Sequence, residues 1–479
     1  MSTHPAPFDS DSKGDKAQAR PYNAYHLRHV PQPEADLTHT GPGTPMGEYL
    51  RLSWQPVCLS EELTELPKAL TIMGEPLVAF RDRGGRVGVL QRQCAHRGAS
   101  LEFGIVQKRG VRCSYHGWLF DVDGRVLETP CEPAGSPRKE TVYQGAYPAF
   151  ERDGLVFAYM GPPEKKPDFP EYDSYSQPQG TRLVAFSNIY PCNWLQVCEN
   201  IMDHMHAAVL HNNMTVESVS SDIAAGTTLA GFGDMPTMHW ETTRNGNAML
   251  FVAARRLPEG KVWIRISEMV LPNYVQIGSL APTASRYRHS TTSLTRWHVP
   301  VDDTHMIIFG WRHFNSEIDP ENLARPDQCG VDKIDFLIGQ TGNRTYEEGQ
   351  RAPGDWEVIC SQGAIAVHKL EHPATSDTGV LMYRRLLRKA MAGQTGPDTS
   401  FHPAVGKSRH QYAQDTVFHI PMKPGKDDVA MMRDLNRKLL AVIQEGDAVP
   451  QAQRDRHIRR RLDELENEMN GGEARAGRT

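Results

Sequence analysis

The sequence predicts an α+β protein in which an antiparallel β domain is followed by a mixed domain, an antiparallel sheet flanked by helices. Three observations predict this class. The chain has 479 residues, more than a single hydrophobic core usually spans. Short apolar runs separated by glycine-containing turns continue to about residue 165, where the proline-rich stretch MGPPEKKPDFPEYDSY indicates a linker. Beyond this stretch, strand-like runs and longer helix-like runs both occur.

The domain boundaries follow from these changes of composition. Residues 1–45 are rich in Pro, Ser, Asp and His and lack periodicity, which indicates a flexible N-terminal arm. We expect the β domain over residues 46–165 and the mixed domain over residues 166–425. Residues 426–479 are expected to be a C-terminal helical extension that ends in a disordered tail.

Individual elements can be placed from local patterns. In the first domain, the predicted strands include PLVAF, VGVL and GLVFAYM. The second domain opens with NWLQVCENIMDHMHAAVLHNNM, which predicts a helix that ends at Asn212 and Asn213, because Asn tolerates a left-handed cap. Strands are predicted in NAMLFVAARRL, KVWIRISEMVL, YVQIGSL, STTSLTRWHV and HMIIFGW. Helices are predicted in TGVLMYRRLLRKAM, DVAMMRDLNRKLLAVIQE and QAQRDRHIRRRLDELENEM.

The composition excludes several classes of protein. The net charge is −5, so no basic excess is present to neutralise the phosphates of a nucleic acid. The opening residues lack the apolar core of a secretory signal, and no run approaches the roughly 18 apolar residues of a membrane span. The eight cysteines are thinly spread, unlike a disulfide framework. We therefore expect a cytoplasmic protein without a membrane or nucleic-acid partner.

Two short motifs in the first domain predict a metal site. Cys94 and His96 form a Cys-x-His pair, and Cys113 and His116 form a Cys-x-x-His pair. In a structural zinc site, one short motif usually supplies two cysteines and another supplies two histidines, whereas each pair here mixes the two residue types. The pattern favours a 2Fe–2S cluster in which one iron binds the two thiolates and the other binds the two imidazoles. A zinc-bound structural protein is the alternative, and it would be colourless.

A second metal site is predicted in ENIMDHMHAAVLH. Asp203, His206 and His211 provide two imidazoles and a carboxylate, the donor set of mononuclear non-haem Fe(II) sites. His206 and His211 are five residues apart, about 140° round an ideal helix, so both can reach one metal only if the helix loosens. His204 lies seven residues before His211 and would align better on a regular helix. Spacing alone leaves His204 and His206 as alternatives.

The two metal motifs together resemble those of the Rieske non-haem iron aromatic-ring oxygenases, specifically their oxygenase component. CAHRG and CSYHGW are similar to the two loops of the family's Rieske domain, and the resemblance extends over roughly residues 46–390. It implies that His206 and His211 are the iron ligands and that the carboxylate ligand lies far downstream. The segment GDWEVICSQG places it at Asp355, although Gly354 and Cys360 stand where the family has Gln and Glu. Asp377 is the fallback ligand.

The resemblance also implies how the two sites cooperate. Asp203 would bridge His116 of one subunit and His206 of the next in a homotrimer or a dimer of trimers, accepting a hydrogen bond from each imidazole. Asn200 would lie near the iron without binding it. The chain contains no ferredoxin-type cysteine motif and no convincing nucleotide fingerprint. Electrons would therefore come from a separate NAD(P)H-dependent reductase or ferredoxin.

The implied activity is the hydroxylation or O-demethylation of an aromatic, carboxylated substrate with O2. The resemblance is to the group of phthalate dioxygenase and the O-demethylases of lignin-derived biaryls. Arg265, which shares a strand face with Trp263, and Arg256 are candidates to bind the substrate carboxylate. The alternative is a Rieske electron-transfer protein whose second domain only docks partners. Such a protein would keep its function when His206 or His211 is replaced.

Overall fold

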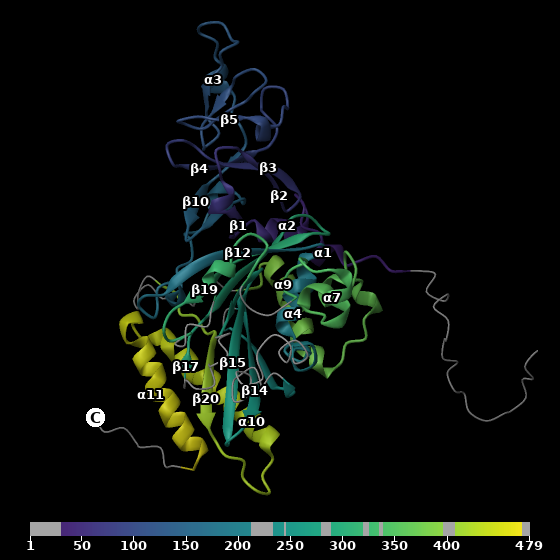
Figure 1. The fold of residues 1–479 in the computed structure, drawn as a ribbon, viewed down its shortest axis with the longest axis vertical. Helices are drawn as coiled ribbons and strands as arrows, with labels where there is room; N and C mark the ends of the chain where they lie inside the picture. The colour runs from purple at the N-terminus through teal and green to yellow at the C-terminus, as the bar shows by residue number, and fades with distance from the viewer. Residues whose placement is uncertain are drawn as a thin grey trace, which may run out of the picture.

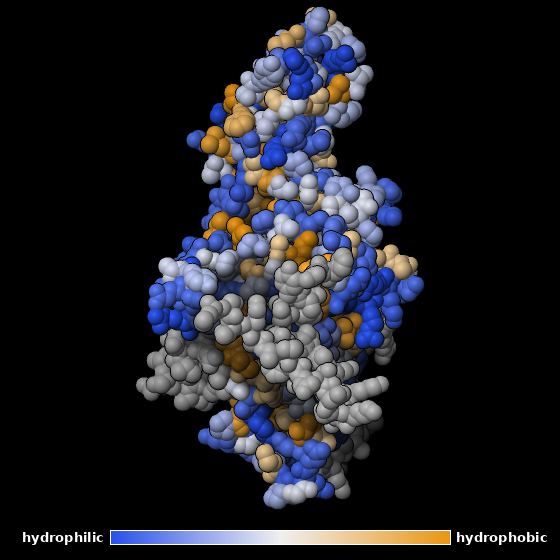
Figure 2. Space-filling model, turned by 90° about the vertical axis from the view of Figure 1, so that its right-hand side faces the viewer, coloured by the Kyte–Doolittle hydropathy of each residue, from blue (hydrophilic) through white to orange (hydrophobic). Residues whose placement is uncertain are grey.

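The computed structural model describes residues 30–211, 233–243, 246–278, 289–319, 325–334, 339–395 and 408–471. The first domain forms a narrow lobe that projects from a wider body, as Figures 1 and 2 show. Antiparallel strands and flanking helices make up the body, which confirms the predicted α+β class. Among the described residues, no helix has both the length and the apolar character needed to cross a membrane.

The first domain consists of three small antiparallel sheets. One has the order β1 (Trp54–Leu59), β11 (Leu155–Tyr159), β10 (Ala149–Arg152). The second has the order β2 (Lys68–Ile72), β3 (Glu75–Arg81), β4 (Val87–Gln91), β9 (Ala146–Tyr147). The third has the order β5 (Ile105–Val106), β6 (Val111–Arg112), β7 (Leu119–Phe120), β8 (Val126–Glu128). Phe80, Trp118 and Phe120 lie in the core between the second and third sheets, directly beneath the two predicted metal loops.

The body is built on one nine-stranded antiparallel sheet. Its main path has the order β12 (Arg182–Tyr190), β19 (Met306–Phe314), β18 (Leu294–Pro300), β16 (Tyr274–Ile277), β15 (Lys261–Val270), β14 (Ala248–Leu257), β13 (Thr237–Thr242). Off this path, β20 (Gln414–His419) pairs with β15 and with β17 (His289–Ser290). Aromatic rings join the sheet to the first domain: Phe157 lies 5.3 Å from Trp297 and 5.7 Å from Trp311 between ring centroids. These contacts form one continuous core across the domain boundary.

Helices cover both faces of this sheet. One group lies on the face that carries the predicted iron ligands: α4 (Trp194–Met202), α7 (Tyr346–Arg351), α8 (Asp355–Cys360) and α9 (Thr378–Met391). On the other face, α10 (Asp428–Gln444) and α11 (Gln451–Met469) pack against alternate residues of β14 and β15. Leu435, Leu439 and Leu462 are fully buried there. The helices predicted at the C-terminal end are therefore present, and they pack into the core of the body instead of extending from it. Residues 472–479 of the predicted tail lie outside the described residues.

The prediction of a flexible arm over residues 1–45 does not hold for residues 30–45. Residues 1–29 lie outside the described residues, but residues 30–45 are packed against the body and contain the short helix α1 (Ala35–Thr38), with α2 (Pro45–Leu50) following. Leu37 is buried, and its carbonyl accepts a hydrogen bond from the Trp194 indole at 3.2 Å. The carboxylates of Glu34 and Asp36 pair with Arg388 on α9. The composition of residues 30–45 could not predict these contacts, because their partners lie over 150 residues away in the chain.

The helix predicted to run to Asn213 is interrupted. Helix α4 ends at Met202, and Asp203 adopts an extended backbone with φ −100° and ψ 102°. A separate π-helical turn, η6 (Ala207–His211), follows. A π-helix places residues five apart on nearly the same face, since its hydrogen bonds join residues i and i+5. The loosening that the His206–His211 spacing requires is therefore present, and it begins before His206.

Candidate active site

The two loops of the first domain have the same backbone geometry, offset by 19 residues. The Gly98 amide donates to the Cys94 carbonyl, and the Gly117 amide donates to the Cys113 carbonyl. The Cys94 amide then donates to the Ala99 carbonyl, and the Cys113 amide donates to the Trp118 carbonyl, each at 2.8 Å. Gly98 and Gly117 have φ values of 75° and 73°, which favour glycine. This repeated turn explains why a glycine ends both motifs.

The loops bring like donors together. The thiols of Cys94 and Cys113 are buried side by side, and burial raises the pKa of the Cys94 thiol to about 11. The rings of His96 and His116 lie 4.6 Å apart and are partly exposed. The Trp118 ring stacks on His96 at 4.7 Å. Paired thiols inside and paired imidazoles outside fit the donor set of a 2Fe–2S cluster bound by two cysteines and two histidines.

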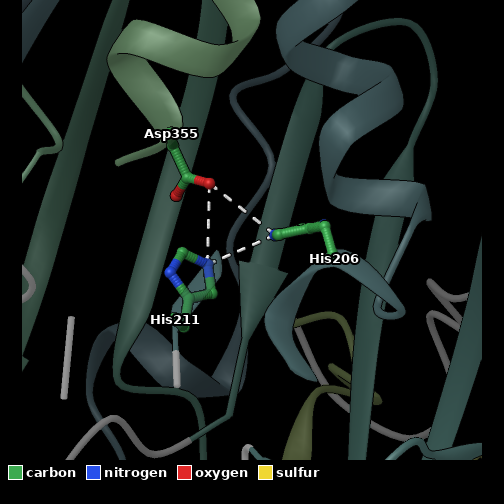
Figure 3. A group of neighbouring side chains, drawn as sticks. All are labelled: His206, His211 and Asp355. Atoms are coloured by element: carbon green, nitrogen blue, oxygen red, sulfur yellow. Dashed lines mark hydrogen bonds and ion pairs between the residues drawn. The ribbon is translucent and has the colours of Figure 1, made fainter. Parts of the chain in front are cut away.

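Three side chains of the body converge on a second point, as Figure 3 shows. The Nε2 atoms of His206 and His211 are 3.2 Å apart, and Oδ1 of Asp355 lies 3.6 Å from the first and 3.5 Å from the second. The three donor atoms lie within 4.8 Å of one another. His204 and Asp377 are not part of this group. The geometry therefore favours the donor set inferred from the resemblance over both alternatives.

Neighbouring side chains fix the carboxylate of this group. Asp355 is the first residue of α8 and is buried. Its Oδ2 accepts a hydrogen bond from Nε2 of Gln340 at 2.6 Å, and its Oδ1 lies 3.5 Å from Nδ2 of Asn200. A side chain at Gly354 could not be accommodated, because a Cβ atom there would lie 2.5 Å from Cα of Gly339. Gln340 therefore supplies a glutamine contact from another segment, although position 354 lacks the glutamine typical of the family.

The electrostatics of the group suit a cation. Burial alone would raise the pKa of Asp355, but His211, His206 and the Gln340 hydrogen bond outweigh it, so the pKa lies below its ordinary value. Burial lowers the pKa of His211. Burial also opposes protonation of His206, but the nearby carboxylates of Asp203 and Asp355 raise its pKa. An ionised carboxylate beside two imidazoles is a donor set for a divalent first-row metal.

Asp203 lies between this group and the protein surface. Its Oδ2 is 3.6 Å from Nδ1 of His206, and Oδ1 accepts a hydrogen bond from the Met205 amide at 2.7 Å. Burial would raise the pKa of Asp203, but His206 and these backbone contacts lower it below its ordinary value. Asn200, Asp203 and His206 also line an open surface cavity of about 610 Å³. The carboxylate can therefore contact His206 from inside and a partner from outside.

The two candidate arginines lie on opposite faces of the sheet. Arg265 is buried on the face of the metal group, and its Nε and Nη2 bind the two carboxylate oxygens of Asp415, each at 2.9 Å. Its guanidinium also lies 4.9 Å from the Trp263 ring centroid. Arg256 points to the other face, where it pairs with Asp428 of α10. The structure brings Arg265 towards the metal group but does not bring Arg256 there.

Further buried polar groups beside the metal group were not predicted. Arg296 is buried near Asp355 and Tyr190, burial lowers its pKa, and its Nε has no hydrogen-bond partner among the described residues. On the same strand face, Nδ1 of His298 lies 3.1 Å from Sγ of Cys198. Arg296 and His298 alternate with Trp297 and Val299 in the predicted strand STTSLTRWHV, a sequence signal that could have placed both on one face. Gln340 carries no comparable signal, because only the fold brings it to Asp355.

A second acidic cluster near α9 is an ion-pair network. Glu199, His368 and Glu371 also place three potential metal donors together. Arg384 lies between the two carboxylates, with Nε 2.5 Å from Glu199 and Nη1 2.6 Å from Glu371. The guanidinium already supplies the positive charge that the carboxylates require. This cluster therefore holds α9 against α4.

Comparisons with known proteins agree with this geometry. Residues 53–148 match a family model described as the Rieske [2Fe-2S] domain, and residues 158–332 match one described as LigXa C-terminal domain like. The chain is 56% identical over 457 residues to the tert-butanol monooxygenase / tert-amyl alcohol desaturase oxygenase subunit of Aquincola tertiaricarbonis, covering 94% of this chain and 97% of the relative.

The chain belongs to the Rieske oxygenases. It is 42% identical to the 5,5'-dehydrodivanillate O-demethylase oxygenase subunit of Sphingobium sp., covering 78% of this chain and 84% of the relative. It is 39% identical to the phenoxybenzoate dioxygenase subunit alpha of Ectopseudomonas oleovorans, covering 76% of this chain and 86% of the relative. The crystal structure of dicamba monooxygenase bound to dicamba has the same fold, with a TM-score of 0.52 and 19% identity. The match covers 72% of this chain and 99% of the dicamba monooxygenase chain.

This Rieske oxygenase is an oxygenase component, as the resemblance implied. The match to the first domain confirms the 2Fe–2S cluster and excludes the zinc alternative. The relatives are monooxygenases, dioxygenases and O-demethylases, so the prediction of an enzyme is confirmed over that of a pure electron carrier. An oxygenase subunit acts on O2 and an organic substrate, and its electrons come from a separate protein.

Proposed function

We propose that this Rieske oxygenase hydroxylates a carbon–hydrogen bond of its substrate at an iron held by His206, His211 and Asp355. The observation that carries this assignment is the convergence of these three donors within 4.8 Å. When bound, a non-haem Fe(II) supplies open positions at which O2 can react beside the substrate. For hydroxylation, the substrate, O2, two electrons and two protons give the hydroxylated product and one water.

The residues around the three ligands prepare this site. Gln340 and Asn200 contact Asp355 and orient its carboxylate. His211 and Asp355 are buried, which limits the entry of water. His206, in contact with Asp203, lies on the side of the surface cavity, so electrons can reach the metal group from that side.

Iron and sulfide analysis of one variant tests the assignment. Intact protein should contain about three irons and two acid-labile sulfides per chain. His206→Ala should lose about one iron and at least roughly 100-fold of the substrate-dependent O2 uptake while keeping the Rieske spectrum, because the cluster ligands are untouched. His305→Ala, which alters a half-exposed histidine in the β18–β19 turn, is the matched control. Full activity of His206→Ala would contradict the assignment.

We further propose that the enzyme is a homotrimer, or a dimer of trimers, in which each Rieske lobe docks on the next subunit. Within one chain, the lobe that carries β5 projects away from α4 (Figure 1). The lobe exposes 71% of Phe103 and 59% of Tyr115, the latter directly before His116. The cavity beside Asp203 offers the half-exposed apolar residues Val358 and Leu370. Docking would cover both apolar surfaces and bring His116 to Asp203.

The substitution Asp203→Asn tests whether electrons pass from the cluster of one subunit to the metal group of the next through Asp203. An amide has an NH2 donor in place of the second acceptor oxygen, so it cannot accept a hydrogen bond at each of two oxygens as a carboxylate does. We expect electron transfer from the reduced cluster to slow by roughly 10- to 100-fold, measured as cluster reoxidation in a single turnover. The iron content should stay unchanged, since Asp203 lies outside the ligand group. Unchanged reoxidation in a protein that sediments as a trimer would contradict the bridging role.

An NAD(P)H-dependent reductase or a ferredoxin is the proposed electron donor. Oxidation of NADH by a mixture of the two proteins, dependent on the cluster ligands, would support this assignment.

Two substrate classes have support. An aromatic, carboxylated substrate fits the relatives that act on phenoxybenzoate and 5,5'-dehydrodivanillate, and it would be hydroxylated or O-demethylated. A small tertiary alcohol fits the relative with 56% identity over nearly the whole chain, whose name refers to tert-butanol and tert-amyl alcohol. The second class has the stronger support because the similarity is higher and extends over both domains and the C-terminal helices. Comparison of O2 uptake with 2-methyl-2-butanol and with 4-methoxybenzoate distinguishes the two.

A further inference from the structure

Two buried polar atoms beside the metal group lack hydrogen-bond partners. His204 lies next to the ligand His206 in sequence but outside the ligand group. Its ring faces the sheet, where it lies 5.0 Å from the ring of Phe251 on β14. Nε2 of His204 is buried and has no hydrogen-bond partner among the described residues. No described residue therefore supplies the hydrogen bond that this buried nitrogen requires.

Ser267 provides the second such atom. In the register of β14 and β15, Ser267 lies directly opposite Phe251. Side chains of directly opposed residues in antiparallel strands lie on the same face of the sheet, so Ser267 shares the face that His204 covers. Ser267 is fully buried, and its Oγ has no hydrogen-bond partner among the described residues. Unpaired buried polar atoms destabilise a fold, and they are uncommon in native proteins unless a ligand or water binds them.

The surroundings define the chemistry of a molecule that these atoms would bind. The His204 carbonyl accepts a hydrogen bond from Nη2 of Arg255 at 3.2 Å, which fixes the backbone of this segment. The nearby Arg265 already holds the carboxylate of Asp415 through two hydrogen bonds. An imidazole nitrogen can donate or accept one hydrogen bond, and a serine hydroxyl can do both at once, which matches a neutral hydroxyl group. Phe251, which neighbours both residues, offers an apolar surface.

We propose that Nε2 of His204 and Oγ of Ser267 bind the hydroxyl group of an uncharged alcohol substrate, while Phe251 packs against its carbon skeleton. This inference rests on the proposed oxygenase function and specifies the substrate class of the same site. Neither residue binds the metal in this assignment. Both determine which molecules remain beside it long enough to react.

Two probe molecules of equal shape test the inference in the anaerobic holoenzyme. The first is 2-methyl-2-butanol, and the second is 2,2-dimethylbutane, in which a methyl group replaces the hydroxyl. Intact protein should bind the alcohol at least roughly tenfold more tightly than the hydrocarbon in calorimetric titrations. His204→Phe keeps an aromatic ring against Phe251 and removes both nitrogens, so it should abolish most of this preference. Ser267→Ala should reduce it by roughly threefold.

Three controls keep the result specific. His239→Phe alters a histidine of β13 that lies opposite Val252, on the face covered by α10, and it should leave the preference unchanged. His204→Gln retains a side-chain donor and acceptor and should restore part of the alcohol affinity. The iron content and the Rieske spectrum should be the same in His204→Phe and in the intact protein.

Several outcomes would overturn the inference, and they differ from failure of the proposed function. Equal binding of both probes by intact protein, or unchanged alcohol binding in His204→Phe, would exclude the hydroxyl subsite. Loss of iron in His204→Phe would make His204 a metal ligand instead. If 4-methoxybenzoate stimulates His206-dependent O2 uptake while the alcohol does not bind, the subsite fails and the oxygenase function stands. If no substrate stimulates His206-dependent O2 uptake, the oxygenase function itself fails.

Discussion

The two metal sites of this protein are built in opposite ways. The four cluster ligands come from two loops only 19 residues apart, and each loop repeats the same hydrogen bonds around a glycine. The three ligands of the second group come from η6 and its preceding turn and, about 150 residues later, from the first turn of α8. The ligands of a site made by local turns can be predicted from a short sequence motif. The ligands of a site made by packing distant elements can be predicted only in part.

The largest effect should come from breaking the local site. Cys94→Ala removes one thiolate from the cluster, so we expect loss of about two irons, both sulfides and essentially all activity. Iron and sulfide assays with the visible spectrum measure this loss. Cys131→Ser is the matched control, since Cys131 is exposed and its thiol donates to the His116 carbonyl at 3.5 Å, a hydrogen bond that a serine hydroxyl can also make. Loss of the cluster in the control as well would mean that the loops depend on more than their four ligands.

A smaller effect on function is expected when a residue that orients a ligand of the second metal group is replaced. Gln340→Leu removes the hydrogen bond to Oδ2 of Asp355 but leaves all three ligands in place. We expect iron affinity to fall by roughly 10- to 100-fold, measured by competition with a chelator. Gln362→Leu alters a glutamine that lines the outer cavity, and it should change iron affinity by less than about threefold. Equal effects of the two exchanges would show that Gln340 does not orient Asp355.

The smallest effect on activity is expected at Arg256. Because Arg256 pairs with Asp428 on the face of the sheet opposite the metal group, Arg256→Met should leave KM and kcat within about twofold. The partly buried ion pair that it breaks should cost about 1 kcal/mol in the free energy of unfolding, measured with urea. A large rise in KM at unchanged stability would restore Arg256 as a substrate ligand.

The sequence by itself determined the α+β class, the Rieske loops and most elements of the second domain. The helices predicted at residues 378–391 and 451–469 coincide with α9 and α11, because each carries a clear amphipathic period. The motif spacing pointed to His211 and left His204 and His206 as alternatives, and the resemblance chose His206 and Asp355. These features depend on residues close together in the chain, or on a pattern that the family shares.

Tertiary structure decided the rest. Whether residues 30–45 form an arm depended on buried contacts with α4 and α9. The side of the sheet that each arginine faces depended on strand register, which a shift of one residue reverses. The choice of His206 over His204 depended on the end of α4 at Met202, since the break turns the first ring towards Asp355 and the second towards Phe251. Such outcomes arise from the packing of distant elements, so short stretches of sequence do not specify them.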